Sequence, residues 1–129
     1  LAALALGHDG VLGLLLGTDH QDSLALRMCK DGLALNEHKS LSETERVFLC
    51  LPLEHSESLE DQKHCVEMFE ELVADARPEF KDFAKSTLDY AHQHLKVIQD
   101  FGRFPHRNKA LGRETTAEEA EWLAEGGGF

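Results

Sequence analysis

Residues 80–102 read FKDFAKSTLDYAHQHLKVIQDFG and carry the clearest helical pattern of the chain. Its apolar and small side chains recur at the i, i+4, i+7 spacing of a helix with one buried face. The positions that carry this stripe are Phe80, Ala84, Thr87, Ala91, Leu95 and Ile98. Gly102 follows at the position where glycine ends helices, because it adopts the left-handed backbone readily. The pattern therefore predicts one long helix that ends at Phe101.

Similar patterns precede this stretch. A helix is predicted from Ser58, with Phe69 on its apolar stripe, and Pro78 ends it because proline cannot continue a helix. Another is predicted from about Ser23 to about Gly32. The residues before it are rich in Leu, Ala and Gly, and they predict two short buried helical pieces joined at residues 7–10 and followed by a polar segment.

Two capping boxes mark further helix starts. Ser42 with Glu45, and Thr116 with Glu119, have the spacing at which the two residues cap a helix reciprocally. The apolar run after Ser42 predicts a buried helix that Pro52 kinks or ends. The capping box at Thr116 predicts a short last helix. The three glycines at 126–128 are expected to end it.

These elements predict the fold class. No segment points to a strand in preference to a helix, and the connections between helices are short. We therefore expect one all-α domain over residues 1–129, built of antiparallel helical hairpins as a tetratricopeptide-like array or a bundle.

The composition is that of a globular protein, with 42% hydrophobic and 29% charged residues among 129. Thirteen Lys and Arg against 24 Asp and Glu give a formal charge of −11. This acidity argues against nucleic acid and anionic membranes as partners, since both bind clustered basic side chains. The apolar N-terminal stretch is broken before the roughly 20 residues of a membrane span, so no membrane insertion is expected.

The cysteines indicate the compartment. Cys29, Cys50 and Cys65 are odd in number and widely spaced, which argues against a secreted disulfide framework. We expect three buried thiols and a reducing location, the cytoplasm or alternatively an organelle matrix.

Two segments carry residues of binding type, around positions 51–62 and 101–114. Three arginines in the second segment form a local basic island that could hold a carboxylate or a phosphate. Alternatively, they pair with Glu54, Glu57 or Glu114 and tie a long loop to the helices. The candidate ligand-binding residues are His55, Glu57, His94, Arg103, His106, Arg107, Asn108 and Arg113.

The histidines in these segments leave three interpretations open. A hydrogen-bonded structural role is the default, and a general base tuned near neutrality or a metal ligand are the others. Because no His-Glu-x-x-His motif or other metal-ligand spacing is present, we predict no metal site and no cofactor.

The same two segments resemble a known family. The runs ERVFLCLPLEHSE at 45–57, FGRFPHRN at 101–108 and LGRE at 111–114, with the ending Gly127-Gly128-Phe129, are similar to the bacterial "domain of unknown function 924" family. The resemblance covers residues 41–129 and implies an all-α, tetratricopeptide-like fold without an established activity. It also implies that the chain is the C-terminal part of a longer family domain. A Phe-Pro-Arg-Asn segment typical of the family's N-terminal part is absent here.

Three functions follow as hypotheses. Helical hairpins present surfaces to protein or peptide partners, so a binding or interaction module is the first. The second is a small-anion-binding or enzymatic site built from the His and Arg residues of the loop. The third is an accessory subunit of a larger complex, suggested by the apolar segment 1–16.

Overall fold

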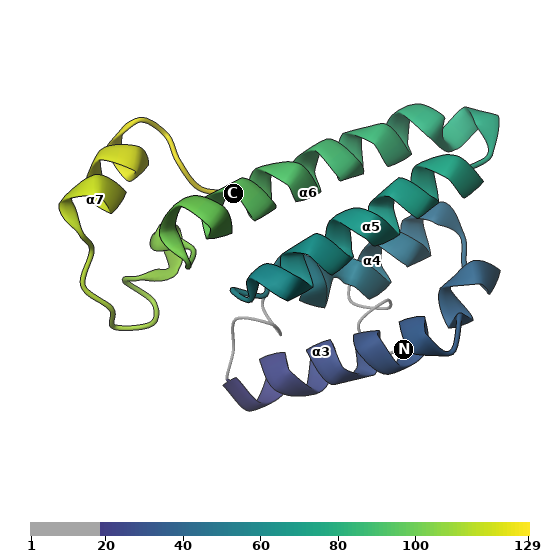
Figure 1. The fold of residues 1–129 in the computed structure, drawn as a ribbon, viewed down its shortest axis with the longest axis horizontal. Helices are drawn as coiled ribbons and strands as arrows, with labels where there is room; N and C mark the ends of the chain where they lie inside the picture. The colour runs from purple at the N-terminus through teal and green to yellow at the C-terminus, as the bar shows by residue number, and fades with distance from the viewer. Residues whose placement is uncertain (1–18) are drawn as a thin grey trace.

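Four long helices run back and forth in the computed structural model, which describes residues 19–129 and side-chain burial from residue 23 onward (Figure 1). The long helices are α3 (Asp19–Ala34), α4 (Glu43–Glu54), α5 (Leu59–Asp75) and α6 (Lys81–Phe101). The short helices are η1 (Glu37–Ser40), η2 (Pro78–Phe80), η3 (Pro105–Arg107) and α7 (Ala117–Ala124). Because residues 19–129 contain no strand, the predicted all-α class is confirmed.

The core lies where α3, α4, α5 and α6 meet. Helix α5 packs along α6 on one side and against α4 on the other, and α3 covers α4 (Figure 1). Phe69 and Leu72 of α5 are almost fully buried, and they meet Leu53 of α4. Ala84 and Ala91 of α6 have no exposed surface, and their small side chains let α6 approach the core closely. Consecutive helices are antiparallel, whereas a tetratricopeptide-like order of the hairpins stays a prediction.

The helix ends follow the sequence signals closely. Both capping boxes form, at Ser42 and at Thr116, and Gly102 ends α6 with a φ of 72°. Pro52 lies in the last turn of α4, which ends two residues later. The start of α3 was predicted wrongly: the helix begins at Asp19, because polar and acidic residues are favourable in a first turn and do not have to precede it.

The end of α4 depends on one buried amide. Gln62 of α5 is fully buried, and its Nε2 donates to the carbonyl oxygens of Glu54 at 2.6 Å and Ser56 at 2.8 Å. The last carbonyls of a helix have no partner within it, so a side chain must supply one when water cannot. Gln62 thereby fixes the backbone that carries Glu54 and His55.

The three cysteines are free and buried, as predicted. Burial raises the pKa of each thiol, that of Cys29 to about 12, so none is a ready nucleophile. The helical pieces predicted within residues 1–17 lie outside the described residues. Within the described part, no helix is both long and apolar enough to cross a membrane.

Candidate functional site

The eight residues predicted to bind a ligand fall into two groups. Four of them hold the loop after α6 in place through ion pairs and hydrogen bonds: Glu57, Arg103, Asn108 and Arg113. The other four line a cavity between α4, α6 and this loop: His55, His94, His106 and Arg107. Ion pairing thus accounts for the first group, whereas ligand binding by the second group stays a prediction.

The first group is centred on Glu57, which follows α4. Its carboxylate accepts two hydrogen bonds from the Arg113 guanidinium, at 2.7 and 3.1 Å, and one from the Phe104 backbone N–H at 2.6 Å. Burial acts to raise the pKa of Glu57, but these hydrogen bonds outweigh it and lower the pKa. We call Glu57, Phe104 and Arg113 the loop clamp.

A second ion pair ties the loop to α7. Arg103 donates to both carboxylate oxygens of Glu119, at 2.8 and 2.7 Å, and to the carbonyl oxygen of Glu114. Hydrogen bonds from Arg103 and Thr116 lower the pKa of Glu119 to about 2. Asn108 is buried beside this pair, where it accepts a hydrogen bond from Arg113 at 3.0 Å. These polar groups already have partners and stabilise the loop.

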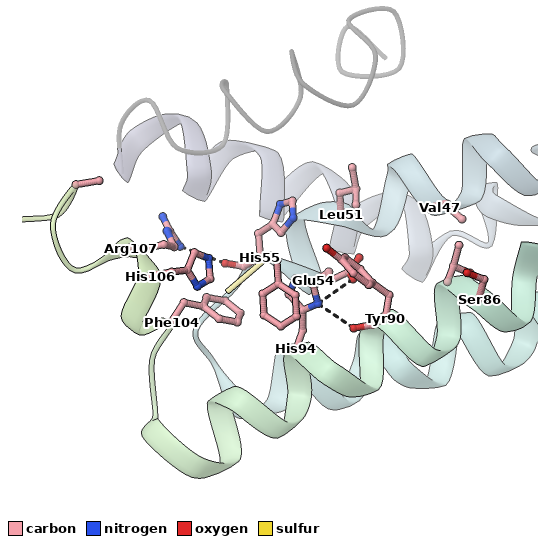
Figure 2. A pocket seen from close by; sticks show the side chains of 13 residues that line it. Val47, Leu51, Glu54, His55, Ser86, Tyr90, His94, Phe104, His106 and Arg107 are labelled. Carbon is pink, nitrogen blue, oxygen red and sulfur yellow. Dashed lines mark hydrogen bonds and ion pairs between the residues drawn. The ribbon is translucent and has the colours of Figure 1, made fainter. Parts of the chain in front are cut away.

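The cavity has a volume of about 380 Å³, within the range of small-molecule sites. Figure 2 shows Arg107 and His106 at one end, Val47 and Ser86 at the other, and Glu54, Tyr90 and His94 between them. Its apolar walls come from Val47, Leu51, Phe104, Ala110 and Phe129. The cavity is thus a mainly apolar space with basic side chains gathered at one end.

Glu54 and His94 form the polar centre of the cavity (Figure 2). Each residue is only 3% exposed, and His94 Nδ1 lies 3.2 Å from Glu54 Oε1. The hydrogen on Nδ1 goes to the Tyr90 carbonyl oxygen at 2.8 Å, since a carbonyl can only accept. Glu54 Oε1 is left without a hydrogen bond from any described residue. A buried carboxyl oxygen without a hydrogen-bond donor is costly and uncommon in folded proteins.

Burial sets the protonation of this pair. It raises the pKa of Glu54 to about 7 and lowers the pKa of His94 to about 4, because a charge loses its hydration there. The hydrogen bond to Tyr90 and the neighbouring His106 change the pKa of His94 less, in opposite directions. At neutral pH, therefore, His94 is uncharged and Glu54 is about half protonated.

The basic end of the cavity is built by α4 and the loop. Arg107 lies on η3, and its Nη1 donates to the carbonyl oxygen of His55 at 3.3 Å. His106 precedes it, and burial with the nearby Arg107 charge lowers the pKa of His106. Arg107 is thus the formal positive charge that borders the cavity at this end, and the His106 imidazole, whose pKa is lowered, lies beside it.

Aromatic rings surround His94. The ring of Phe129 is stacked on the imidazole, with centroids 3.7 Å apart and planes at 14°. Tyr90 and Phe104 meet the imidazole edge-on, at 4.9 and 5.7 Å. This arrangement shields the Glu54–His94 pair from water and gives the centre of the cavity flat apolar faces.

Sequence patterns did not predict the roles that three residues of this region have in the structure. Glu54 was named only as a possible partner of the arginines, Glu119 only as a capping residue, and Phe129 only as part of the family ending. A signal for Glu54 existed, since it lies four residues after the buried Cys50 and shares its helix face. No local pattern predicts that Phe129 returns to α6.

The metal-binding interpretation gains no support in this region. Within residues 19–129, no three His, Cys, Asp or Glu side chains are grouped to hold a metal ion. His94 uses its Nδ1 for the Tyr90 carbonyl, and Glu54 is the acidic side chain among the cavity residues that the structure describes.

These observations define the class of protein. It is an all-α protein of antiparallel helices with a small cavity beside the loop after α6. Residues 18–127 match the family described as "Bacterial protein of unknown function (DUF924)", and the chain belongs to this family. A solved structure of a protein of unknown function from Agrobacterium tumefaciens is similar, with 32% identity and a TM-score of 0.63. The match covers 84% of this chain and 57% of the Agrobacterium chain. No curated protein matches the chain.

Proposed function

We propose that the protein binds a small organic acid in the cavity between α4, α6 and the loop after α6. The observation that carries the proposal is that Glu54, a lining residue of the cavity, has a buried oxygen, Oε1, that accepts no hydrogen bond from the described residues. The Arg107 end would hold the acid group, and the apolar walls would hold the organic part.

Charge favours an anion over a cation at this site. Arg107 is the formal cation among the cavity residues that the structure describes, and the His106 ring beside it can donate one N–H. Glu54 opposes an anion only when ionised, and burial keeps it largely protonated below pH 7. A protonated Glu54 can also donate to a ligand oxygen, which would satisfy the carboxyl group that now lacks a partner.

The experiment compares benzoate with benzylamine, which have the same ring and opposite charges. Ligands that bind only the folded state raise its melting temperature, and at ten times Kd the gain is about 1.4 kcal/mol, or roughly 3–6 °C for this size. We expect benzoate to produce this shift at pH 6 and benzylamine to produce none.

A charge-matched pair of variants locates the site. Arg107→Leu should lower benzoate affinity about tenfold or more, because a charge-assisted hydrogen bond is lost. Arg27→Leu removes the same charge from an exposed position of α3 and should leave the affinity unchanged. Stabilisation by benzylamine alone would make the site a cation site, and no shift with either compound would contradict the proposal.

The other sequence-based functions are not favoured by a particular contact. Protein or peptide binding and a place in a larger assembly stay predictions, as does the location in the cytoplasm or an organelle matrix. Phe129 of the protein's own tail covers part of the cavity, which suits a small molecule better than an extended peptide.

A further inference from the structure

The tail after α7 returns to α6 and places one ring in the cavity. Phe129 stacks on His94 at 3.7 Å and meets Tyr90 edge-on at 5.5 Å and His106 at 5.7 Å. Near-parallel stacking at 14° requires a flat ring, so this face of His94 is complementary to planar molecules.

Three glycines make this return possible. Gly126 and Gly128 have positive φ values of 94° and 124°, which other residues rarely adopt. A Cβ on Gly127 would lie 2.3 Å from the Trp122 ring, so the chain passes Trp122 with no space for a side chain. The tail therefore reaches His94 along a path that depends on glycine and runs against the chain's single tryptophan.

The same tail is partly exposed. Phe129 is 42% exposed, and within residues 19–129 its ring contacts aromatic rings of α6 and of the loop. The backbone of the tail is fixed by Gly126 and Gly127, whose N–H groups donate to carbonyls of α7 at 3.1 and 2.9 Å. Glycine segments also gain much conformational freedom on release. A ligand of moderate affinity can therefore compete with the tail for the face of His94.

Building on the proposed function, we infer that the ligand is an aromatic acid whose ring takes the place of Phe129 on His94. In the free protein the tail, residues 125–129, occupies the face of His94 where the ligand ring would bind, and the ligand displaces it. The His106 ring borders this position, and Arg107 follows it on η3. A carboxylate attached to a ring stacked on His94 would thus point towards the basic end of the cavity.

Trp122 reports the position of the tail, because it contacts Gly127 and is the chain's only tryptophan. We expect benzoate to change the Trp122 emission as the tail leaves. Cyclohexanecarboxylate, which has the same charge and a puckered ring, should bind several times more weakly. Binding itself is measured by calorimetry, independently of the fluorescence.

Two variants release the tail by different means. Phe129→Ala removes the ring, and Gly127→Ala forces the backbone away from Trp122 while Phe129 is kept. Both should tighten benzoate binding about threefold or more, because the free site no longer has to expel its occupant. Phe83→Ala, at an exposed position in the first turn of α6, is the matched control and should leave the affinity unchanged.

The outcomes separate the two proposals. Benzoate binding that weakens in Phe129→Ala would make Phe129 a permanent wall of the site and overturn the inference alone. So would equal affinities for the two acids or an unchanged Trp122 emission on binding. An absence of benzoate binding in the wild type and in both tail variants would overturn the proposed function as well.

Discussion

Replacing Glu54 with glutamine should stabilise the protein relative to the wild type as the pH rises, by about 3 kcal/mol between pH 4.5 and pH 8. Glu54 has an ordinary pKa of 4.5 in the unfolded chain and a pKa of about 7 when folded. Each pKa unit corresponds to about 1.4 kcal/mol, so the wild type loses about 3 kcal/mol as ionisation of the buried carboxyl becomes favourable. Glutamine cannot ionise and escapes this loss.

The sign follows from proton counting. Between pH 4.5 and 7 the folded state holds a proton on Glu54 that the unfolded state has released, so the contribution of Glu54 to stability falls with rising pH. His94 has the opposite effect: its folded pKa is about 4, so its stability contribution grows between pH 4 and 6.5. The two effects nearly cancel in the wild type, and Glu54→Gln should expose the titration of His94 as a loss of stability below pH 6.5.

Urea unfolding of both proteins from pH 4.5 to pH 8 measures the difference directly, because the other titrating groups are common to both. Glu67→Gln, at an exposed position of α5, is the control and should give a difference within about 0.5 kcal/mol that does not change with pH. A difference that stays constant from pH 4.5 to pH 8 would show that the folded state does not hold Glu54 protonated.

The second large effect is expected at the loop clamp. Glu57→Gln removes the charge that binds Arg113 and places an amide N–H against one of its donors. Both side chains of the pair are about a quarter exposed, which reduces the cost below that of a fully buried pair. We expect a loss of about 2 kcal/mol in the free energy of unfolding at pH 7.

The loss should disappear in acid. Because hydrogen bonds lower the pKa of Glu57 in the folded state, its stabilising effect is present above the ordinary pKa of 4.5 and is lost as the pH falls through the lowered folded value. Glu114→Gln, in the same loop, keeps the backbone carbonyl that Arg103 uses and should change little. Equal stabilities of Glu57→Gln and the wild type at pH 7 would show that the clamp does not hold the loop.

The sequence predicts the helices well because their signals are local. Capping boxes at Ser42 and Thr116, the glycine after Phe101 and the stripe through Phe69 each depend on residues a few positions apart. The start of α3 was the exception, since a polar segment can precede a helix or form its first turn.

The candidate site was less predictable because it depends on distant pairings. The sequence shows that arginines and carboxylates are present, but it does not show that Glu57 binds Arg113, 56 positions away, while Arg107 lines the cavity. The roles of Glu54 and Phe129 likewise follow from the packing of α4 and the tail against His94. Residue types in the loop predicted a polar region, and only the fold separates the residues that form its ion pairs from those that line the cavity.

The most direct test of the central claim is a calorimetric titration of the wild type with benzoate at pH 6 and pH 8. If the anion binds to the cavity with Glu54 protonated, the competent fraction falls from about 0.9 to about 0.1 over this range, and the affinity falls about tenfold. Glu54→Gln should bind benzoate without this fall. No binding at pH 6, or an affinity that rises towards pH 8, would contradict the assignment of the cavity as a site for organic acids.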